Sequence, residues 1–442
     1  MAKNTHEIRD PVHVFIKFDT QERQVVDSPP FQRLRCIHQL AMTYLVYPGA
    51  THRRFEHSLG VMELASRVYD IITNPENLND QIHNLFPETQ DKDQLRYWRR
   101  VLRLAALCHD IGHLPFSHAA EDLLPEGWDH EQMTRALILS PDMQKIWSGM
   151  RPRPDAEDIV KLALGKKKAA DLDFTDWQSL LAEIIVGDAF GVDRMDYLLR
   201  DSLHTGVAYG RFDHFRLIDT MRILPPPAQG DEKEGSSEPY IGVEAGGLQS
   251  AESLLLARYF MFSQVYFHPV RRIYDIHLKD FLSDWLEEGH YPIDTEQFLN
   301  NSDVEIVSAM RQAVKIAGSP GQFHADRIIN RNHFRVLHEG SLNDIAAFGG
   351  TMNAGKIAQA ASGQFGMDNV RFDSYPPKES TIDFPVRERD DSIVSAQAKS
   401  QVLNRTPAAA FDYVFVDKDI LPKAKAWFEK NKRDLLAVNE EE

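Results

Sequence analysis

The amino-acid sequence predicts a mainly α-helical core followed by a smaller α+β region at the C-terminus. Apolar residues recur at helical spacing through long stretches of residues 1–317. From residue 318 short turns dominate, until the strand-like FDYVFVD at residues 411–417 is followed by a last helix. The 442 residues are enough for a large core and a second, small domain. We therefore expect a core over residues 1–317 and an α+β region over residues 318–442.

The composition is that of an ordinary globular protein with an acidic surface. Hydrophobic residues make up 43% and charged residues 26%, and 50 basic against 66 acidic side chains give a formal net charge of −16. This balance argues against general binding of nucleic acids or anionic membranes, although a local basic pocket for a small anion is compatible with it. We expect no membrane partner.

The N-terminal residues and the cysteines favour a cytoplasmic protein. The stretch MAKNTHEIRDPVH has no apolar signal core, and no run of about 18 apolar residues occurs in the chain. The two cysteines, Cys36 and Cys108, lie in apolar helical patterns, so we expect them to be reduced core residues. They cannot supply a cysteine-based zinc site.

The elements of the first half follow from local patterns. Residues 13–19 alternate as a short strand does, and Ser28-Pro29-Pro30 opens a helical stretch that ends at Pro48-Gly49. Apolar spacing predicts further helices over residues 53–72, 95–110, 129–139, 176–188 and 191–204.

A polar segment rich in Pro, Gly and Ser, residues 225–239, interrupts the helical pattern. We expect it to be a flexible loop between strands at residues 222–224 and 240–243. Residues 250–287 are strongly helical and very aromatic. Aromatic helices of this kind are typical of a buried core, and an interface between subunits is the alternative.

One short segment crowds ionisable side chains behind an apolar run. LCHDIGHLPFSH, residues 107–118, holds three histidines and one aspartate after the apolar VLRLAALC. The apolar run predicts the buried face of a helix, so the cluster opens into the interior. Because desolvating such groups alone is costly, they must satisfy each other or surround a charged ligand.

Four side chains form a candidate site for a divalent metal: His57, His109, Asp110 and Asp193. Neighbouring residues on a helix point about 100° apart, so His109 and Asp110 can flank one ion from a single helix. Two histidines and two aspartates suit Mn, Fe, Zn, Ni or Mg, with positions left open for water and substrate. Taken singly, His57 also fits a hydrogen-bonded core residue and Asp193 a helix N-cap. His113 follows His109 by one turn and falls near the same ion.

A second pattern lies on the helix that begins near Asp193. Asp193, Tyr197 and Asp201 are spaced i, i+4 and i+8, so one face carries a metal ligand, an aromatic hydroxyl and a second carboxylate. At 1.5 Å per residue, Asp201 lies about 12 Å along the axis from Asp193. Asp196 and Arg200 fit a solvated charged face.

Several motifs occur in a fixed order along residues 8–286. They are IRDPVH, SPPFQRLRCIHQL, YPGATHRRFEHSLGV, CHDIGHLPFSH, DHEQ, GVDRMDYLLRD and LLLARYFMFSQVYFHPVRRIY. Together they resemble the HD-domain phosphohydrolase superfamily. The resemblance is most specific to the branch of the sterile-alpha-motif and HD-domain deoxynucleoside triphosphate triphosphohydrolases and their bacterial relatives.

This resemblance implies a helical HD-domain core around one divalent ion, and it implies roles for the matching residues. The implied metal ligands are His57, His109, Asp110 and Asp193. The implied catalytic residues are His113, His118 and His130, together with Glu121, which orients His130. The implied substrate-binding residues are Gln39 for the sugar, Arg54 and Arg194 for phosphates, Tyr197 for the sugar or base, Asp201 for the sugar 3′-hydroxyl, and Tyr274.

The chain departs from the family pattern beside the expected nucleotide pocket. Ala41-Met42 stands where the family has Gly-Gly, and Arg194 stands where it has a lysine. Tyr266 and Val270 replace an arginine and a histidine that contact nucleotide, which favours another nucleotide or a shorter phosphate chain.

A second nucleotide site is also implied by the resemblance. Asp27 and Arg35 match residues of the family's guanine-nucleotide activator site, whereas His6 stands where that site has a lysine. We therefore treat Asp27 and Arg35 as candidate residues for an allosteric nucleotide.

The main functional hypothesis is a metal-dependent nucleotide phosphohydrolase. Its most specific form is a dNTP triphosphohydrolase that cleaves between the sugar oxygen and the α-phosphorus and releases deoxynucleoside and triphosphate. A phosphodiesterase or phosphomonoesterase on the same metal, and a nucleotide sensor with weak turnover, are the alternatives. The expected cofactor is one divalent ion (Mn, Fe, Ni, Zn or Mg). The expected partners are a nucleotide substrate, a nucleotide activator and further copies of the chain in a homodimer or homotetramer.

Overall fold

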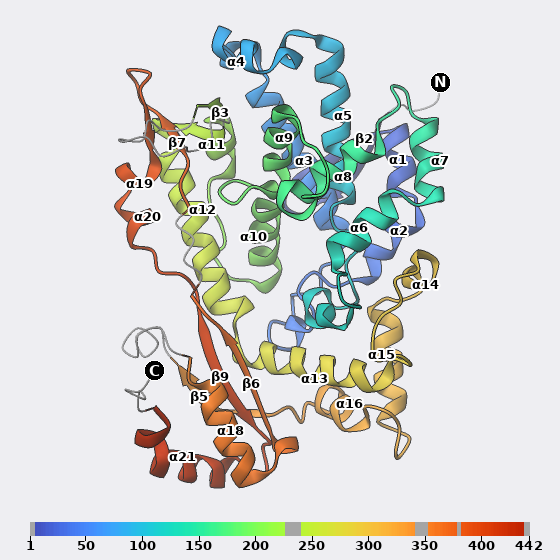
Figure 1. The fold of residues 1–442 in the computed structure, drawn as a ribbon, viewed down its shortest axis with the longest axis vertical. Helices are drawn as coiled ribbons and strands as arrows, with labels where there is room; N and C mark the ends of the chain where they lie inside the picture. The colour runs from blue at the N-terminus through green and yellow to red at the C-terminus, as the bar shows by residue number, and fades with distance from the viewer. Residues whose placement is uncertain (1–4, 226–239, 341–351, 378–381, 437–442) are drawn as a thin grey trace.

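A computed structural model describes residues 5–225, 240–340, 352–377 and 382–436 of the chain (Figure 1). The protein is mainly helical, as predicted, with an α+β region at its C-terminal end. Of the expected loop at residues 225–239, all but residue 225 lies outside the described residues. Among the helices that are described, none is both long and apolar enough to span a membrane.

Five helices form the part of the core that carries the candidate site. They are α3 (Arg54–Ile72), α5 (Lys92–Cys108), α8 (Ala156–Lys168), α9 (Asp176–Val186) and α10 (Val192–Thr205). α3 packs against both α5 and α10, and α8 packs against α5 and α9. Glu56 caps the start of α3 by accepting the backbone N–H of Arg53, and Gly206, whose φ of +80° favours glycine, directly follows the end of α10.

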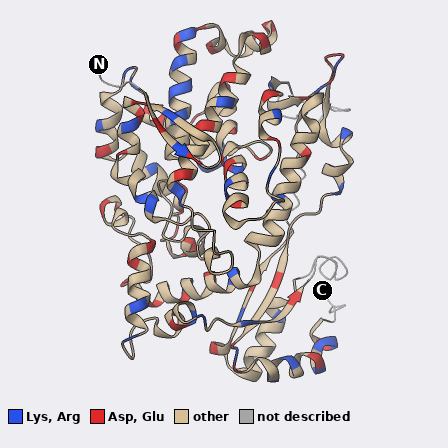
Figure 2. Cartoon of the chain, turned by 180° about the vertical axis from the view of Figure 1, so that it is seen from behind, with Lys and Arg blue, Asp and Glu red and all other residues tan. Residues whose placement is uncertain are grey.

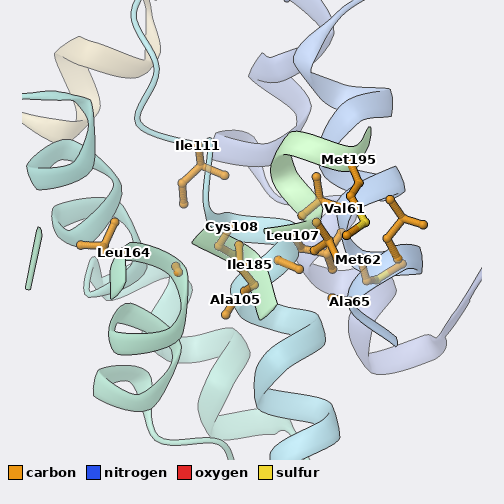
Figure 3. Packing of buried hydrophobic residues seen from close by; sticks show 14 of the residues in the cluster. Val61, Met62, Ala65, Ala105, Leu107, Cys108, Ile111, Leu164, Ile185 and Met195 are labelled. Atoms are coloured by element: carbon orange, nitrogen blue, oxygen red, sulfur yellow. The ribbon is translucent and has the colours of Figure 1, made fainter. Parts of the chain in front are cut away.

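Apolar side chains from these helices pack together in the buried core (Figure 3). The labelled residues are Val61, Met62, Ala65, Ala105, Leu107, Cys108, Ile111, Leu164, Ile185 and Met195. Cys108 and Ile111 are fully buried and flank the pair His109-Asp110 in the chain, so this polar pair is anchored on the hydrophobic core. Burial raises the pKa of the Cys108 thiol, which keeps it neutral.

The helix expected from Ser28 to Gly49 is broken into short pieces. The segment contains α2 (Pro29–Arg33) and the 3₁₀ turns η1 (Leu34–Cys36) and η2 (Thr43–Leu45). Ile37 is extended and Ala41 has a φ of +47°, so neither continues the helix. Between them, the backbone N–H of Gln39 donates to the carbonyl of His52. The break therefore places Gln39 next to the start of α3.

The aromatic stretch is also interrupted. α12 (Leu248–Met261) runs into the π-helical turn η7 (Phe262–Tyr266), and α13 (Pro269–Trp285) starts after Phe267 and His268. Pro269 lacks a backbone N–H and is tolerated at the first position of α13. As predicted, much of the stretch is buried, including Tyr274 and Phe281.

The C-terminal region is built on a three-stranded antiparallel sheet in the order β5-β9-β6. Its strands are β5 (Arg335–Gly340), β6 (Val370–Tyr375) and β9 (Phe411–Val416), and the helices α18 (Ala354–Phe365) and α21 (Leu421–Leu436) pack on it. Phe411 and Tyr375 contact Phe267, which lies just before α13, so the sheet lies between its own helices and the helical core (Figure 1). Residues 318–403 thus hold more regular structure than the turn-rich sequence predicts.

A second, four-stranded sheet joins segments from both sides of residue 318. Its order is β3-β4-β7-β8, with strands β3 (Met221–Leu224), β4 (Tyr240–Glu244), β7 (Pro385–Arg387) and β8 (Ile393–Ser395). β4 and β7 pair in parallel, through Val243 opposite Val386 and Glu244 opposite Arg387. The domain boundary at residue 318 stays a prediction, and this pairing links the two predicted parts.

The remaining elements surround the core. They are β1 (Thr5–Asp10), β2 (Val14–Asp19), α1 (Thr20–Val26), α4 (Asp80–Leu85), α6 (His130–Ile138), α7 (Pro141–Gly149), α11 (His214–Asp219), α14 (Thr295–Leu299), α15 (Asp303–Ala313), α16 (Gln322–Ile329), α19 (Ala396–Lys399) and α20 (Gln401–Arg405), with the 3₁₀ turns η3 (Pro75–Asn77), η4 (Pro87–Gln90), η5 (Ser117–Leu123), η6 (Ala245–Gly247) and η8 (Met367–Asn369). Acidic and basic residues are interspersed along the helices seen from behind (Figure 2).

Candidate metal centre and active site

The four predicted metal ligands come together from three helices. His57 lies on α3, His109 and Asp110 directly follow α5, and Asp193 lies in the first turn of α10. Nitrogen atoms of His57 and His109 and a carboxylate oxygen of Asp110 all lie within 4.8 Å of one another. Asp193 Oδ1 is 3.0 Å from His57 Nε2 and 3.6 Å from His109 Nε2. The residues thus converge on one small volume.

Hydrogen bonds on the far side of each ring turn the two Nε2 atoms toward that volume. His57 Nδ1 donates to Asp196 Oδ2 at 2.8 Å, and His109 Nδ1 donates to the carbonyl of Ala106 at 2.8 Å. With its proton on Nδ1, each imidazole offers the lone pair of Nε2 as a ligand, an arrangement typical of metal-binding histidines.

The chemistry of these donors fits a divalent cation. His109 Nε2 is buried and has no hydrogen-bond partner within the described part of the chain. Burial alone would raise the pKa of Asp110, but the charges of Arg54, His109 and His113 hold it well below its usual range, so Asp110 is a carboxylate. Two imidazole nitrogens and carboxylate oxygens are ligands that Mn, Fe, Zn and Ni accept. His57, His109 and Asp110 could therefore hold a metal ion.

Asp196 is the most important residue that the sequence reading missed. Asp196 and Arg200 are fully buried, which corrects their interpretation as a solvated charged face. The Asp196 carboxylate accepts hydrogen bonds from His57, from His13 Nε2 at 2.6 Å and from Arg200 Nε at 2.8 Å. A Cβ atom on Gly60 would collide with this carboxylate. A glycine one turn after His57 inside a helix was the available signal for such a close approach.

The predicted catalytic residues His130 and Glu121 lie on α6 and η5, and His113 lies next to His130. His130 Nδ1 contacts Glu121 Oε1 and lies 3.1 Å from Glu131 Oε2. The ring of His130 stacks on that of His113, with centroids 4.0 Å apart. Burial, followed by the charges of Arg54 and His130, lowers the pKa of His113 well below its usual value, so His113 is neutral at pH 7. The side chain of His118 lies outside the described structure.

A cavity of about 630 Å³ opens from the metal centre toward the ends of α8 and α9. Its volume lies in the range of ordinary ligand pockets. The predicted residues among its described lining are Gln39, Arg54, His109, Asp110, His113, His130, Asp193 and Tyr197. Gln39 Oε1 is buried and, within the described chain, lacks a hydrogen-bond partner, so it is available to a ligand hydroxyl.

The two arginines predicted to bind phosphate, Arg54 and Arg194, donate hydrogen bonds to different parts of the protein. Arg54 Nη1 donates to Asp110 Oδ2 at 2.5 Å and Nε to Ser117 Oγ at 2.8 Å, which places its guanidinium beside the metal centre. Arg194 Nη1 instead donates to the carbonyls of Gly187 and Asp188 at the end of α9.

Tyr274 and Asp201 lie away from the cavity. Tyr274 is fully buried and packs on His333, with ring centroids 4.7 Å apart. Asp201 accepts hydrogen bonds from His52 and Tyr266, and it does not occur among the described residues that line the cavity.

The far wall of the cavity carries a lysine run that the sequence reading did not single out. Lys166, Lys167 and Lys168 follow Gly165, whose φ of +72° bends the end of α8. Lys168 Nζ lies 2.9 Å from Glu131 Oε1, so this wall is tied to the residue next to His130. The sequence signal was the run GKKK at the end of α8.

The two candidate activator residues lie near α2, and their role stays a prediction. Asp27 pairs with Arg23 Nε at 3.1 Å on the surface. The Arg35 guanidinium stacks over the ring of Phe55, 3.4 Å from its centroid, and donates to Gln32 Oε1 at 2.9 Å.

Family comparisons match the chain over most of its length. The HD domain matches residues 54–201, and the HD-associated region matches residues 212–371. The first match contains His57, His109, Asp110 and Asp193. The chain therefore belongs to the HD-domain family, a family of metal-dependent phosphohydrolases, as the sequence motifs predict.

Three individual proteins show the extent of the sequence similarity. It is 36% identical over 330 residues to an uncharacterized protein of Methanocaldococcus jannaschii, covering 75% of this chain and 59% of that protein. It is 34% identical over 280 residues to the uncharacterized protein YwfO of Bacillus subtilis, covering 62% of this chain and 54% of YwfO. It is 34% identical over 240 residues to the human deoxynucleoside triphosphate triphosphohydrolase SAMHD1, covering 49% of this chain and 36% of SAMHD1. The chain thus spans between about a third and three fifths of these relatives.

A solved structure shares the fold almost from end to end. A hypothetical protein from Aquifex aeolicus superimposes with a TM-score of 0.75 at 31% sequence identity. The match covers 96% of this chain and 99% of the Aquifex protein. The architecture of the core and of the C-terminal region is therefore shared by both proteins.

Proposed function

We propose that the protein is a metal-dependent dNTP triphosphohydrolase. The observation that carries the proposal is the convergence of two Nε2 atoms and carboxylates beside Arg54 and the stacked pair His113–His130. A bound divalent cation supplies a water of lowered pKa and neutralises phosphate charge. His57, His109, Asp110 and Asp193 would hold the cation. The similarity to SAMHD1 supports a deoxynucleoside triphosphate as substrate.

The chain's own residues supply phosphate binding and proton transfer. Arg54 presents a guanidinium at the metal centre, where its fork matches phosphate oxygens. Glu121 and Glu131 contact Nδ1 of His130 and orient its ring, and we assign His130 the role of giving a proton to the leaving sugar oxygen. Neutral His113 supports the His130 ring by stacking. Cleavage between the sugar oxygen and the α-phosphorus then releases deoxynucleoside and triphosphate.

The sugar is assigned to residues on the α10 side of the cavity. Gln39 Oε1 has no hydrogen-bond partner among the described residues, and Tyr197 adds an aromatic ring to the wall. Asp201 lies two turns beyond Asp193 on α10, about 12 Å along the helix axis. We assign Asp201 to the sugar 3′-hydroxyl, and Arg194, Tyr274 and His118 stay in the proposal as further substrate and catalytic residues.

One observation favours a smaller phosphate ester as the alternative substrate. Both Asp201 oxygens are hydrogen-bonded within the protein, and Tyr274 is fully buried. A phosphomonoesterase or phosphodiesterase would use the same metal and Arg54 without engaging these residues. A nucleotide sensor with weak turnover would bind nucleotide and release little product.

Product analysis tests the proposal. The purified chain is incubated with each dNTP, each NTP, a simple phosphomonoester and a simple phosphodiester, in the presence of Mn²⁺, Mg²⁺, Fe²⁺, Ni²⁺ or Zn²⁺. Release of triphosphate and deoxynucleoside supports the proposal, whereas phosphate or pyrophosphate as first product refutes it. Asp110→Ala is the control for product that does not depend on the site. Tight nucleotide binding without product over hours supports the sensor.

Three further expectations belong to this proposal. The free cysteines Cys36 and Cys108 fit a reducing compartment, so we place the protein in the cytoplasm. We expect a homodimer or homotetramer, which sedimentation tests. A nucleotide at Asp27 and Arg35 would activate turnover, and Arg35→Ala would abolish that activation.

A further inference from the structure

The phenol of Tyr266 is hydrogen-bonded to the Asp201 carboxylate, which the proposed function assigns to the sugar 3′-hydroxyl. The phenol donates a hydrogen bond to Asp201 Oδ2 at 2.7 Å, and His52 Nε2 donates to Asp201 Oδ1 at 2.7 Å. The exposed fractions are 9% for Tyr266, 1% for Asp201 and 3% for His52. A ligand hydroxyl that bonds to Oδ2 from the side of Tyr266 must take the place of the phenolic oxygen.

Tyr266 contacts both Asp201 and Tyr197, a residue of the cavity wall. Tyr197 lines the cavity, and its ring meets that of Tyr266 edge to face, with centroids 6.2 Å apart. Tyr266 is the last residue of the π-helical turn η7, between α12 and α13. π-Helical turns are often found at functional sites. Here the turn directs a phenol at a carboxylate two helical turns from the metal centre.

We propose that Tyr266 is a specificity-determining residue, because its phenol competes with the substrate's sugar 3′-hydroxyl for Asp201. This inference rests on the proposed function, which assigns Asp201 to the sugar. A substrate with a 3′-hydroxyl exchanges one hydrogen bond to the carboxylate for another, so it gains little over a substrate that lacks the hydroxyl. Because of this phenol, the protein should discriminate little between nucleotides with and without a sugar 3′-hydroxyl.

The test removes only the phenolic oxygen. Tyr266→Phe leaves Asp201 Oδ2 free for the sugar, so a 3′-hydroxyl now adds a hydrogen bond to a charged acceptor. We expect the ratio of kcat/KM for a dNTP to that for the matching 2′,3′-dideoxynucleotide, measured with Mn²⁺, to rise about tenfold. Dissociation constants from equilibrium dialysis of both nucleotides should show the same change.

Tyr413→Phe is the matched control. The Tyr413 phenol is also buried, and it donates to the carbonyl of Phe267, the residue after Tyr266, at 3.0 Å. This variant loses a buried phenolic hydrogen bond without touching Asp201. We therefore expect its deoxy-to-dideoxy ratio to stay within about twofold of the wild type.

The outcomes separate this inference from the proposed function. Binding of a dNTP to Tyr266→Phe with an unchanged ratio overturns the role of Tyr266 and leaves the proposed function standing. Failure of the wild type to bind any nucleotide overturns both. If Tyr266→Phe does not fold, Tyr266→Leu also removes the phenol and must raise the ratio.

Discussion

Replacing Asp196 by Asn should weaken both the metal centre and the fold. The carboxylate is fully buried and accepts hydrogen bonds from His57, His13 and Arg200. Asn keeps the shape but removes the charge and turns an NH₂ group toward one of these donors. Breaking one side of a buried ion pair costs about 3–5 kcal/mol. Because Arg200 keeps its bond to Asp10 at 2.8 Å, we expect the lower end, about 3 kcal/mol.

The loss of orientation at His57 has a separate, measurable effect. Outer hydrogen-bond partners of metal-binding histidines contribute about 10–100-fold to metal affinity, so Asp196→Asn should weaken metal binding by that factor. Competition with a chromophoric chelator measures the affinity, and urea unfolding measures the stability. Asp70→Asn is the control, because Asp70 pairs with Arg99 at the surface and such pairs contribute about 1 kcal/mol or less. Wild-type metal affinity in Asp196→Asn would refute the role of Asp196 in orienting His57.

Three further changes test other parts of the site and the fold. His57→Ala should remove the bound metal while circular dichroism stays that of the wild type, and stoichiometric metal by elemental analysis would contradict its role as a ligand. His130→Ala should keep the metal and lose about 100-fold or more in turnover, so a near-normal rate would exclude His130 as the proton donor. Burial and the charges of His13 and Arg67 lower the pKa of His214 to about 4, so the unfolded chain binds a proton between pH 6.5 and 4 that the native protein does not bind. Stability should therefore fall as the pH drops through this window, and urea midpoints at pH 7 and 5 should differ less in His214→Gln than in the wild type.

The convergence of His57, His109, Asp110 and Asp193 could be predicted because these residues lie on regular helices or directly follow one. The spacing of His109 and Asp110, and of Asp193, Tyr197 and Asp201, fixes directions on a helix before any tertiary contact is known. Asp196 and Arg200 share α10 with them, yet charged residues at i and i+4 look the same in solvent and in the interior. Only the packing of α10 against α3 at Gly60 decides that they are buried.

The substrate pocket could be predicted only in part, because it depends on where the chain leaves regular structure. Gln39 reaches the cavity through the break between η1 and η2, which the apolar spacing of the segment concealed. Arg194 turns to the carbonyls that end α9, and this partner is set by tertiary contact. The turn-rich residues 318–403 form strands because their partners, β4 and β9, lie elsewhere in the chain.

The parallel pairing of β4 with β7 has a consequence for synthesis of the chain. β4 ends at Glu244, whereas β7 begins at Pro385. During translation the edge of β4 that pairs with β7 therefore stays unpaired until the intervening residues have been synthesised. The β4–β7 pairing forms late, as contacts between residues distant in sequence do. A ribosome-bound chain halted before residue 385 would hold its metal ligands but expose that edge to other nascent chains. Chaperone capture should thus be strongest in this interval and decline once Arg387 has left the exit tunnel.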